Sequence, residues 1–137
     1  MALTASAIRG ALTARGIGLS DPVTEHDLQQ FETGLNLSLN AYVRDLYRAF
    51  NGFSLADNRS QIQLWSLKEV TENWELCMNC GGQRYLPVGD FLIHSDFVMF
   101  PLEREASPVF YLHERSQLAA DTPEFFEKFI AGAFDFR

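Results

Sequence analysis

Residues 46–53 read LYRAFNGF, and the Asn-Gly pair in this stretch decides whether the chain turns back as a hairpin or ends a helix. An Asn-Gly pair predicts a hairpin when residues that alternate between apolar and polar flank it. Here Leu46, Tyr47 and Phe50 recur at steps of three and four residues, which is typical of a helix face. We therefore expect a helix that ends at the pair. Gly52 should take the left-handed conformation, which is free of a Cβ clash, and the next phenylalanine should fold back onto the last turn.

Two further helices are expected before this one. An apolar stripe within residues 3–12 predicts a helix that Gly16 and Gly18 bring to an end. Thr24 is a good N-cap for a second helix, and Asn40 can cap the helix that ends at the Asn-Gly pair. The first third of the chain is therefore predicted to be helical.

The pattern changes from helical to extended after residue 60. Residues 61–67, QIQLWSL, alternate, and three later segments are rich in aromatic and β-branched residues, so all four are predicted strands. Residues 68–82 fit neither pattern. Prolines should break these strands or lie at their edges, and Gly89 should form a turn or a bulge. The later segments are YLPVGDF at 85–91, FVMFPL at 97–102 and VFYLHE at 109–114, and the prolines are Pro87, Pro101 and Pro108.

A phenylalanine-rich segment, residues 121–137, closes the chain. Thr122 can cap a helix with Pro123 at its first position, and the apolar residues that follow form a broad face. Helices, then strands, then a helix, is an order typical of an α+β domain. We expect a single domain with an antiparallel or mixed sheet, flanked by N-terminal helices and one C-terminal helix.

The chain of 137 residues is acidic, with a net charge of −7. Residues 1–20 hold two arginines and no acid, so residues 21–137 carry 18 acids against 9 bases, a net charge of −9. Such a surface repels nucleic-acid phosphates and suits a basic protein partner, although it also keeps a protein soluble without any partner. No run approaches the ~20 apolar residues of a membrane span, and the N-terminus lacks the apolar core of a signal peptide. We expect a cytoplasmic protein that does not bind membranes.

Cys77 and Cys80 form a lone C-x-x-C motif. Structural zinc needs four ligands, and His94 and His113 match no zinc-finger spacing. A redox motif would open a helix, whereas two glycines follow this motif at once. We interpret the cysteines as part of a loop or of the core, and expect no metal and no cofactor.

His94, Ser95 and Asp96 are the residue types of a hydrolytic relay. If they lie on a strand, neighbouring side chains point to opposite faces and cannot form that relay. The same objection applies to His113 and Glu114. We therefore expect a protein that is not an enzyme.

Acidic residues recur every three positions in residues 69–75, where they would share one face of a helix. The simple interpretation is a solvated face, and the functional one is a docking patch for a basic protein. A tryptophan lies in the same segment, and tryptophan is enriched at interface hot spots. The candidate partner-binding residues are Glu69, Glu72, Glu75, Asp57, Asp90 and Trp74.

Five landmarks occur in order along the chain. They are Phe31-Glu32 with Gly34-Leu35, Asn51-Gly52, the strand from Leu64 to Val70, the strand from Tyr85 to Phe91, and the phenylalanines Phe125, Phe126 and Phe129. Together they resemble the SUKH superfamily, the domain of fungal cell-wall assembly regulators and bacterial toxin-immunity proteins. The match spans about residues 24–132 and leaves residues 1–20 as an N-terminal helical extension. Two positions depart from the pattern, because Asn40 stands where proline is usual and Phe53 where glycine often follows.

The resemblance implies an α+β fold without catalysis and without a fixed cofactor. It further implies an immunity protein that binds and neutralises a protein toxin, for example a nuclease, through its acidic surface. The fungal members imply the alternative, an intracellular regulatory module that binds proteins and has no toxin partner. We expect a monomer or a weak homodimer.

Overall fold

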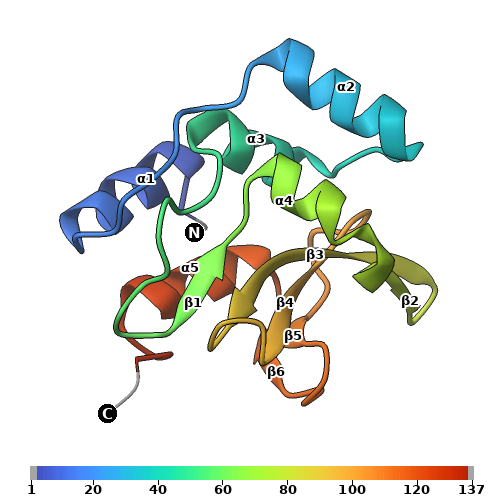
Figure 1. Ribbon diagram of the computed structural model, residues 1–137. Helices are drawn as coiled ribbons and strands as arrows, with labels where there is room; N and C mark the ends of the chain where they lie inside the picture. The colour runs from blue at the N-terminus through green and yellow to red at the C-terminus, as the bar shows by residue number, and fades with distance from the viewer. Residues whose placement is uncertain (1–2, 136–137) are drawn as a thin grey trace.

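The computed structural model describes residues 3–135 and has the α+β fold that the sequence predicts (Figure 1). Residues 136–137 of the predicted C-terminal helix lie outside the described residues. The helices are α1 (Ala5–Ala14), α2 (Glu25–Leu35), α3 (Ala41–Ala49), α4 (Leu67–Glu72), a short 3₁₀ helix (Trp74–Leu76) and α5 (Thr122–Ile130). The strands are β1 (Ile62–Leu64), β2 (Met78–Cys80), β3 (Gln83–Phe91), β4 (Asp96–Pro101), β5 (Val109–Tyr111) and β6 (Gln117–Ala119).

Side-chain caps fix where the helices begin. The predicted caps of α2 and α3 are confirmed, since Thr24 accepts a hydrogen bond from the N–H of Asp27 and Asn40 accepts one from the N–H of Val43. The predicted cap of α5 is wrong by one residue: Asp121 accepts from the N–H of Glu124 at 2.8 Å, and the helix begins after it. A carboxylate one residue earlier is an equally good acceptor for this end of a helix.

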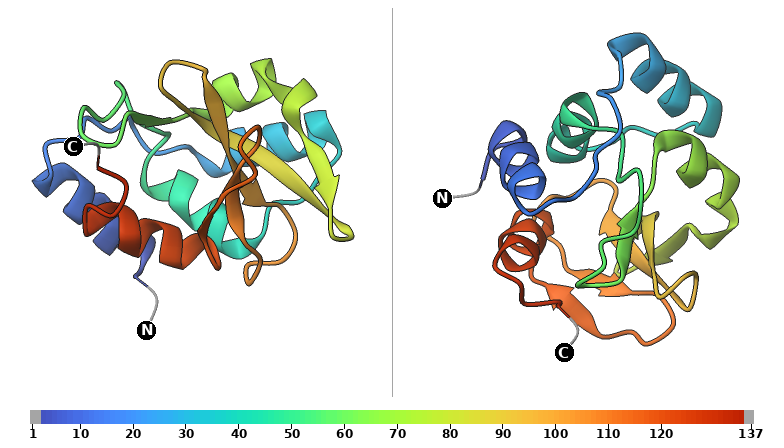
Figure 2. Two further views of the ribbon diagram at one scale, coloured as in Figure 1. Left: turned by 90° about the horizontal axis from the view of Figure 1, so that it is seen from below. Right: turned by 60° about the vertical axis from the view of Figure 1, so that its left-hand side comes forward.

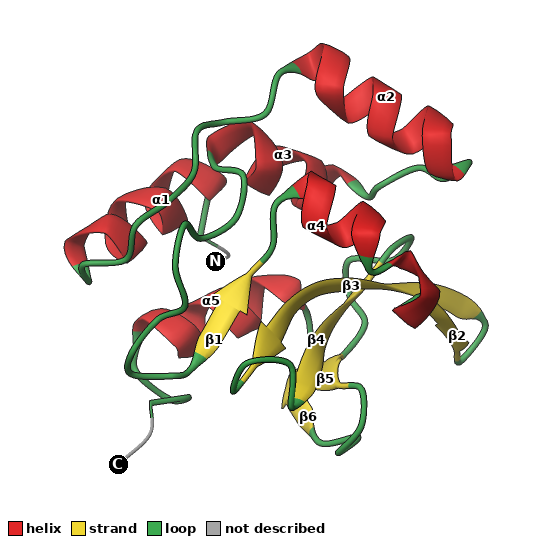
Figure 3. Cartoon of the chain, viewed as in Figure 1, coloured by secondary structure: helices red, strands yellow, loops and turns green. Residues whose placement is uncertain are grey.

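The strands of the described region form one antiparallel sheet in the order β1-β3-β4-β5-β6, and β2 pairs with the other end of β3. Helices α1, α3 and α5 gather on one side of this curled sheet (Figure 3). The sequence does not predict β2 or β6, because these short strands, MNC and QLA, lack the β-branched and aromatic residues that mark β1 and β5.

A bulge interrupts the long central strand β3. The pairing of β3 with β4 shifts between Pro87 and Gly89, which confirms the bulge predicted at Gly89. We expected Pro87 to break a strand or to lie at its edge. This prediction is wrong, because Pro87 lies within β3. Proline cannot donate to a ladder of hydrogen bonds, and a bulge is where a strand tolerates that loss.

The chain leaves α3 through the Asn-Gly pair. Helix α3 ends at Ala49 and Phe50 is extended, so the helix stops before the pair where we expected its end. Gly52 has a φ of +78°, so its predicted left-handed conformation is confirmed. The predicted fold-back of the following phenylalanine is wrong. Phe53 instead pairs with Leu19, donates to the carbonyl of Leu64 at 2.8 Å and packs on Phe129 of α5.

Aromatic rings from α5 fill the core between the helices and the sheet. Phe125 and Phe126 meet Phe100 of β4 edge-on, with ring centroids 5.4 and 5.9 Å apart. Helix α1 lies beside α5 in both views of Figure 2, and the guanidinium of Arg15 sits 5.4 Å from the ring centre of Phe129. The predicted N-terminal extension therefore packs on the helices of the core.

Candidate functional site

The acidic segment is divided between two short helices. Glu69 and Glu72 lie on α4, whereas Glu75 lies on the 3₁₀ helix that follows. The three carboxylates therefore do not sit on one continuous helix face. Glu69 also has a local task, since its carboxylate accepts from the N–H of Ser66 at 3.1 Å and completes a capping box.

The other two carboxylates face solvent. Glu72 and Glu75 are exposed and form no ion pair within residues 3–135, whereas Glu25, Glu103 and Glu124 each pair with a cation. The half-buried Trp74 lies between them and packs one side on the core. We call Glu72, Trp74 and Glu75 the acidic patch. The patch thus combines two unpaired carboxylates with a half-buried tryptophan.

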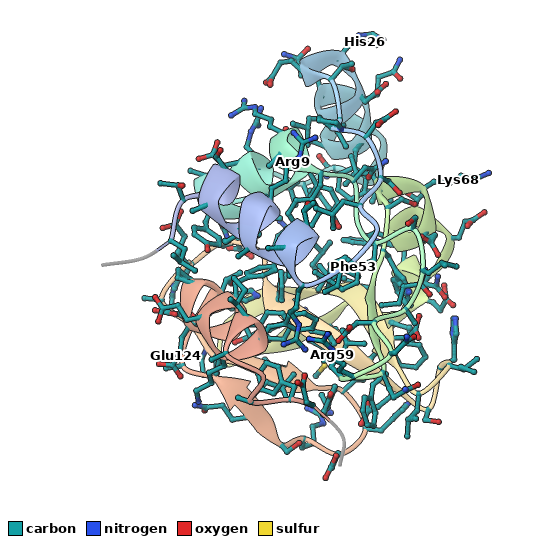
Figure 4. All side chains as sticks on the ribbon, turned by 90° about the vertical axis from the view of Figure 1, so that its left-hand side faces the viewer. Arg9, His26, Phe53, Arg59, Lys68 and Glu124 are labelled. Atoms are coloured by element: carbon teal, nitrogen blue, oxygen red, sulfur yellow. The ribbon has the colours of Figure 1, made fainter. Side chains whose placement is uncertain are left out.

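One cation borders the acidic patch. Lys68 is exposed one helical turn before Glu72, and Figure 4 shows it projecting away from the body of the protein. No ion pair joins Lys68 to a carboxylate among the described residues. Lys68 therefore lies on the same side of α4 as Glu72.

Asp57 lies inside the protein, with 7% of its surface exposed. One carboxylate oxygen accepts from the N–H and the hydroxyl of Ser60 at 3.0 and 2.7 Å, and Arg15 lies 3.6 Å from it. Burial raises the pKa of Asp57, but the hydrogen bonds from Ser60 and the charge of Arg15 outweigh burial, so the pKa lies below its ordinary value. Asp57 thus joins the loop before β1 to the end of α1.

Asp90 is also buried, with 5% of its surface exposed. Its carboxylate accepts from the indole N–H of Trp65 at 2.6 Å, and His94 lies 3.7 Å from it. The six candidate residues thus form two groups. Four lie on α4 or on the 3₁₀ helix after it, and the carboxylates of Asp57 and Asp90 are buried. Their contact with a partner stays a prediction.

An Asp57→Asn variant should test the internal role of this carboxylate. A lowered pKa adds stability that is fully present above about pH 4 and is lost as the pH falls through the folded-state pKa. The variant should therefore be less stable than the wild type by about 1–2 kcal/mol at pH 7, and this difference should shrink below about pH 4. Urea unfolding at pH 7 and pH 3 measures it, and a difference that stays constant would contradict the assignment.

A family model supplies the comparison with known proteins. The model of the SMI1/KNR4 family (SUKH-1) matches residues 22–128, which is most of the chain. The chain belongs to the SMI1/KNR4 family. No curated protein matches the chain.

The landmark residues of the SMI1/KNR4 family hold the fold together. Glu32 accepts from the N–H of Leu39 and pairs with Arg44, both within 2.8 Å. Asn51 accepts from the N–H of Leu67 at 2.9 Å and so caps the start of α4 from a distant part of the chain. The landmarks therefore mark the fold of this family, and the partner-binding residues have to be sought on the surface.

The residue types of a hydrolytic relay do not assemble in this family member. His94 and Ser95 lie in the turn between β3 and β4, so the assumption that they lie on a strand is wrong. Asp96 begins β4, and its carboxylate accepts from the backbone N–H groups of Phe97, His113 and Glu114. The hydroxyl of Ser95 donates to a backbone carbonyl at 2.8 Å. The carboxylate and the hydroxyl are both engaged by backbone groups.

The C-x-x-C motif lies in an extended segment. Cys77 is followed directly by β2, which ends at Cys80, and both thiols are free. Three residues of strand span about 10 Å, which is too far for a disulfide between the two cysteines. Burial raises the pKa of the Cys77 thiol. Cys77 is half-buried, whereas Cys80 is exposed at the end of β2, so the interpretation of the pair as loop or core residues is wrong for Cys80.

Residues 3–135 lack both a metal-binding cluster and a membrane-spanning helix. No three His, Cys, Asp or Glu side chains come close enough together to hold a metal ion. No helix is both long enough and apolar enough to cross a bilayer.

Sequence reasoning missed one group of surface residues. Leu55, Leu92 and Ile93 are the large apolar side chains that are exposed within residues 3–135. Leu92 and Ile93 follow the predicted strand 85–91 directly and continue its apolar character. The polar run of residues 94–96 was the one sequence signal for a turn here.

Proposed function

We propose that this chain is an immunity protein that binds and neutralises a protein toxin, such as a nuclease, through its acidic surface. Membership in the SMI1/KNR4 family is consistent with a non-catalytic immunity or regulatory module. The observation that supports a basic protein partner is the acidic patch, in which Glu72 and Glu75 are exposed and unpaired and the half-buried Trp74 stands between them in the sequence. A cationic toxin surface would be attracted to these charges, and the indole would supply an apolar contact.

The other predicted contact residues support this patch from within. The capping box of Glu69 fixes the start of α4 and thereby the direction of Glu72. Asp90 holds Trp65, the residue before the cap of α4. Asp57 holds the loop that precedes β1. In this proposal these three residues position the surface, while Glu72, Glu75 and Trp74 contact the toxin.

The alternative function is an intracellular regulatory module without a toxin partner. The same acidic patch would then bind a basic cellular protein. The two functions differ in the partner. A toxin that is encoded beside this gene and that the protein binds would support the immunity function and not the alternative.

Reversing the two free charges of the patch should slow the encounter with a basic toxin. We expect the double variant Glu72→Lys, Glu75→Lys to associate about 10-fold more slowly at low salt, because exposed charges act mainly on the association rate. The difference should shrink near 0.15 M salt, where charges are screened beyond about 8 Å. Stopped-flow association with the adjacent toxin across a salt series measures this effect.

The matched control is the double variant Asp21→Lys, Glu127→Lys, which makes the same change in net charge at exposed acids elsewhere. If both double variants slow association equally, the net charge of the protein sets the association rate, and the acidic patch is not the contact site. If the wild type neither binds nor neutralises the toxin, the regulatory alternative is favoured.

A further inference from the structure

The exposed apolar side chains of residues 3–135 come from two segments that a backbone hydrogen bond joins. Leu55 is 76% exposed, Ile93 87% and Leu92 41%. They come from the loop at residues 54–61 and the turn at residues 92–95, which a hydrogen bond from the N–H of Leu92 to the carbonyl of Gln61 joins at 3.0 Å. We call these two segments the hairpin edge, and they lie on the lower side of the molecule in Figure 1.

Backbone strain gathers at the same edge. Six non-glycine residues of the described chain have a positive φ, and four of them lie in the hairpin edge: Gln61, Leu92, Ile93 and His94. A left-handed conformation is unfavourable for an ordinary residue and most of all for a β-branched one such as Ile93. Such strain persists only where the surroundings impose it, and it is concentrated at functional sites.

Hydrogen bonds hold the strained turn in place. The N–H of Ser95 donates to the carbonyl of Phe91 at 3.0 Å, and its hydroxyl donates to the carbonyl of Leu92 at 2.8 Å. The turn therefore presents Ile93 to solvent on a fixed support. An exposed isoleucine gains no burial from this position in the isolated protein, so folding alone does not account for it.

The exposed charge of the hairpin edge is opposite to that of the chain. Asp57 and Asp90 turn inward to Ser60 and Trp65, and Arg59 is left as the exposed charged residue of residues 54–61. Figure 4 labels Arg59 on this loop. In a chain with a net charge of −7, the edge is thus an apolar tip beside a cation. It fits an apolar pocket whose rim carries carboxylates, and it does not fit a cluster of lysines.

We propose that the hairpin edge is the apolar anchor of the toxin interface, with Ile93 inserted into an apolar, acid-rimmed pocket of the toxin. This inference rests on the proposed function. A rigid apolar side chain buried at the centre of an interface governs dissociation, whereas exposed charges such as those of the acidic patch govern encounter. The two surfaces therefore have different kinetic roles.

A protein pocket suits this edge better than a lipid bilayer. Three apolar side chains and one arginine bury little area in a membrane interface, where binding depends on a long apolar face and several cations. Anionic headgroups would also repel a chain of net charge −7.

An Ile93→Asn variant gives two readouts of opposite sign. Asparagine tolerates the left-handed conformation better than isoleucine, so the melting temperature should rise by about 2–5 °C. The same change removes the anchor, so binding to the adjacent toxin should weaken at least about 10-fold, through faster dissociation. A residue with a merely structural role would not give a more stable protein that binds less well. Leu55→Ser, on the other segment, should also weaken binding.

The control is Asn36→Gly, which changes a left-handed residue at the exposed end of α2 and should leave binding unchanged. If the wild type binds the toxin and the Ile93→Asn variant binds equally well, the anchor proposal is wrong but the proposed function stands. Wild type that does not bind would overturn both. A concentration-dependent dimer that Ile93→Asn abolishes, or binding to anionic phospholipid vesicles that it abolishes, would also overturn the anchor.

Discussion

A Gly52→Ala variant should lose at least about 4 kcal/mol of unfolding free energy, which is a large part of the ~5–15 kcal/mol that stabilises a typical domain. Two causes act together. The φ of +78° costs an ordinary residue about 1–2 kcal/mol. An added Cβ would also lie 2.5 Å from the backbone carbon of Trp65 and 2.8 Å from the carbonyl oxygen of Leu64.

The second cause is the larger one, because the atoms in the way belong to the backbone. Making room for a methyl group would push β1 away from the helix end, and β1 pairs with β3 in the sheet. The loss should appear as a lower urea midpoint or as failure to fold at 37 °C.

Gly16→Ala is the matched control, because it isolates the conformational cost. Gly16 has a φ of +87°, and an added Cβ there would meet nothing within 4 Å. This variant should lose only about 1–2 kcal/mol. Equal losses in the two variants would show that the close approach of Trp65 to the glycine has no energetic effect.

The sequence predicts the local features of this region and misses the distant ones. The spacing of Leu46, Tyr47 and Phe50 indicates a helix, and the Asn-Gly pair indicates its end. Asn51 caps α4 from 16 residues away, and no local sequence pattern predicts this contact. The contact depends on how β1, which lies between Asn51 and α4 in the sequence, packs.

The candidate site shows the same limit. Acidic residues are usually exposed, so Asp57 and Asp90 were natural candidates for partner contact. The structure buries both, because the partners that satisfy them include Arg15 and Trp65, far away in the sequence. The exposure of Ile93 escapes prediction for the converse reason. A left-handed turn exposes Ile93 to solvent, whereas the apolar residues before it have the sequence pattern of a strand.

Replacing Glu32 by alanine should cost about 3 kcal/mol, because this one side chain accepts from a buried backbone N–H and supplies one of the two carboxylates that pair with Arg44. Its Oε2 accepts from the N–H of Leu39 at 2.8 Å, in the buried link between α2 and α3. Its Oε1 pairs with Arg44 of α3 at 2.6 Å, and both side chains are largely shielded from water. Removing Glu32 leaves the buried N–H of Leu39 without its acceptor and leaves Arg44 with the exposed carboxylate of Glu25 alone.

Two further variants separate these contributions. Glu32→Gln keeps an acceptor for the N–H of Leu39 and loses the charge opposite Arg44, so its urea midpoint should lie between those of the wild type and the alanine variant. Glu25→Ala removes the other acid that pairs with Arg44, in a solvent-exposed position, and should shift the midpoint little. A shift for Glu25→Ala as large as that for Glu32→Ala would assign the stabilisation to the surface ion pairs of α2 and α3. A shift confined to Glu32 would assign it to the buried carboxylate that joins the two helices.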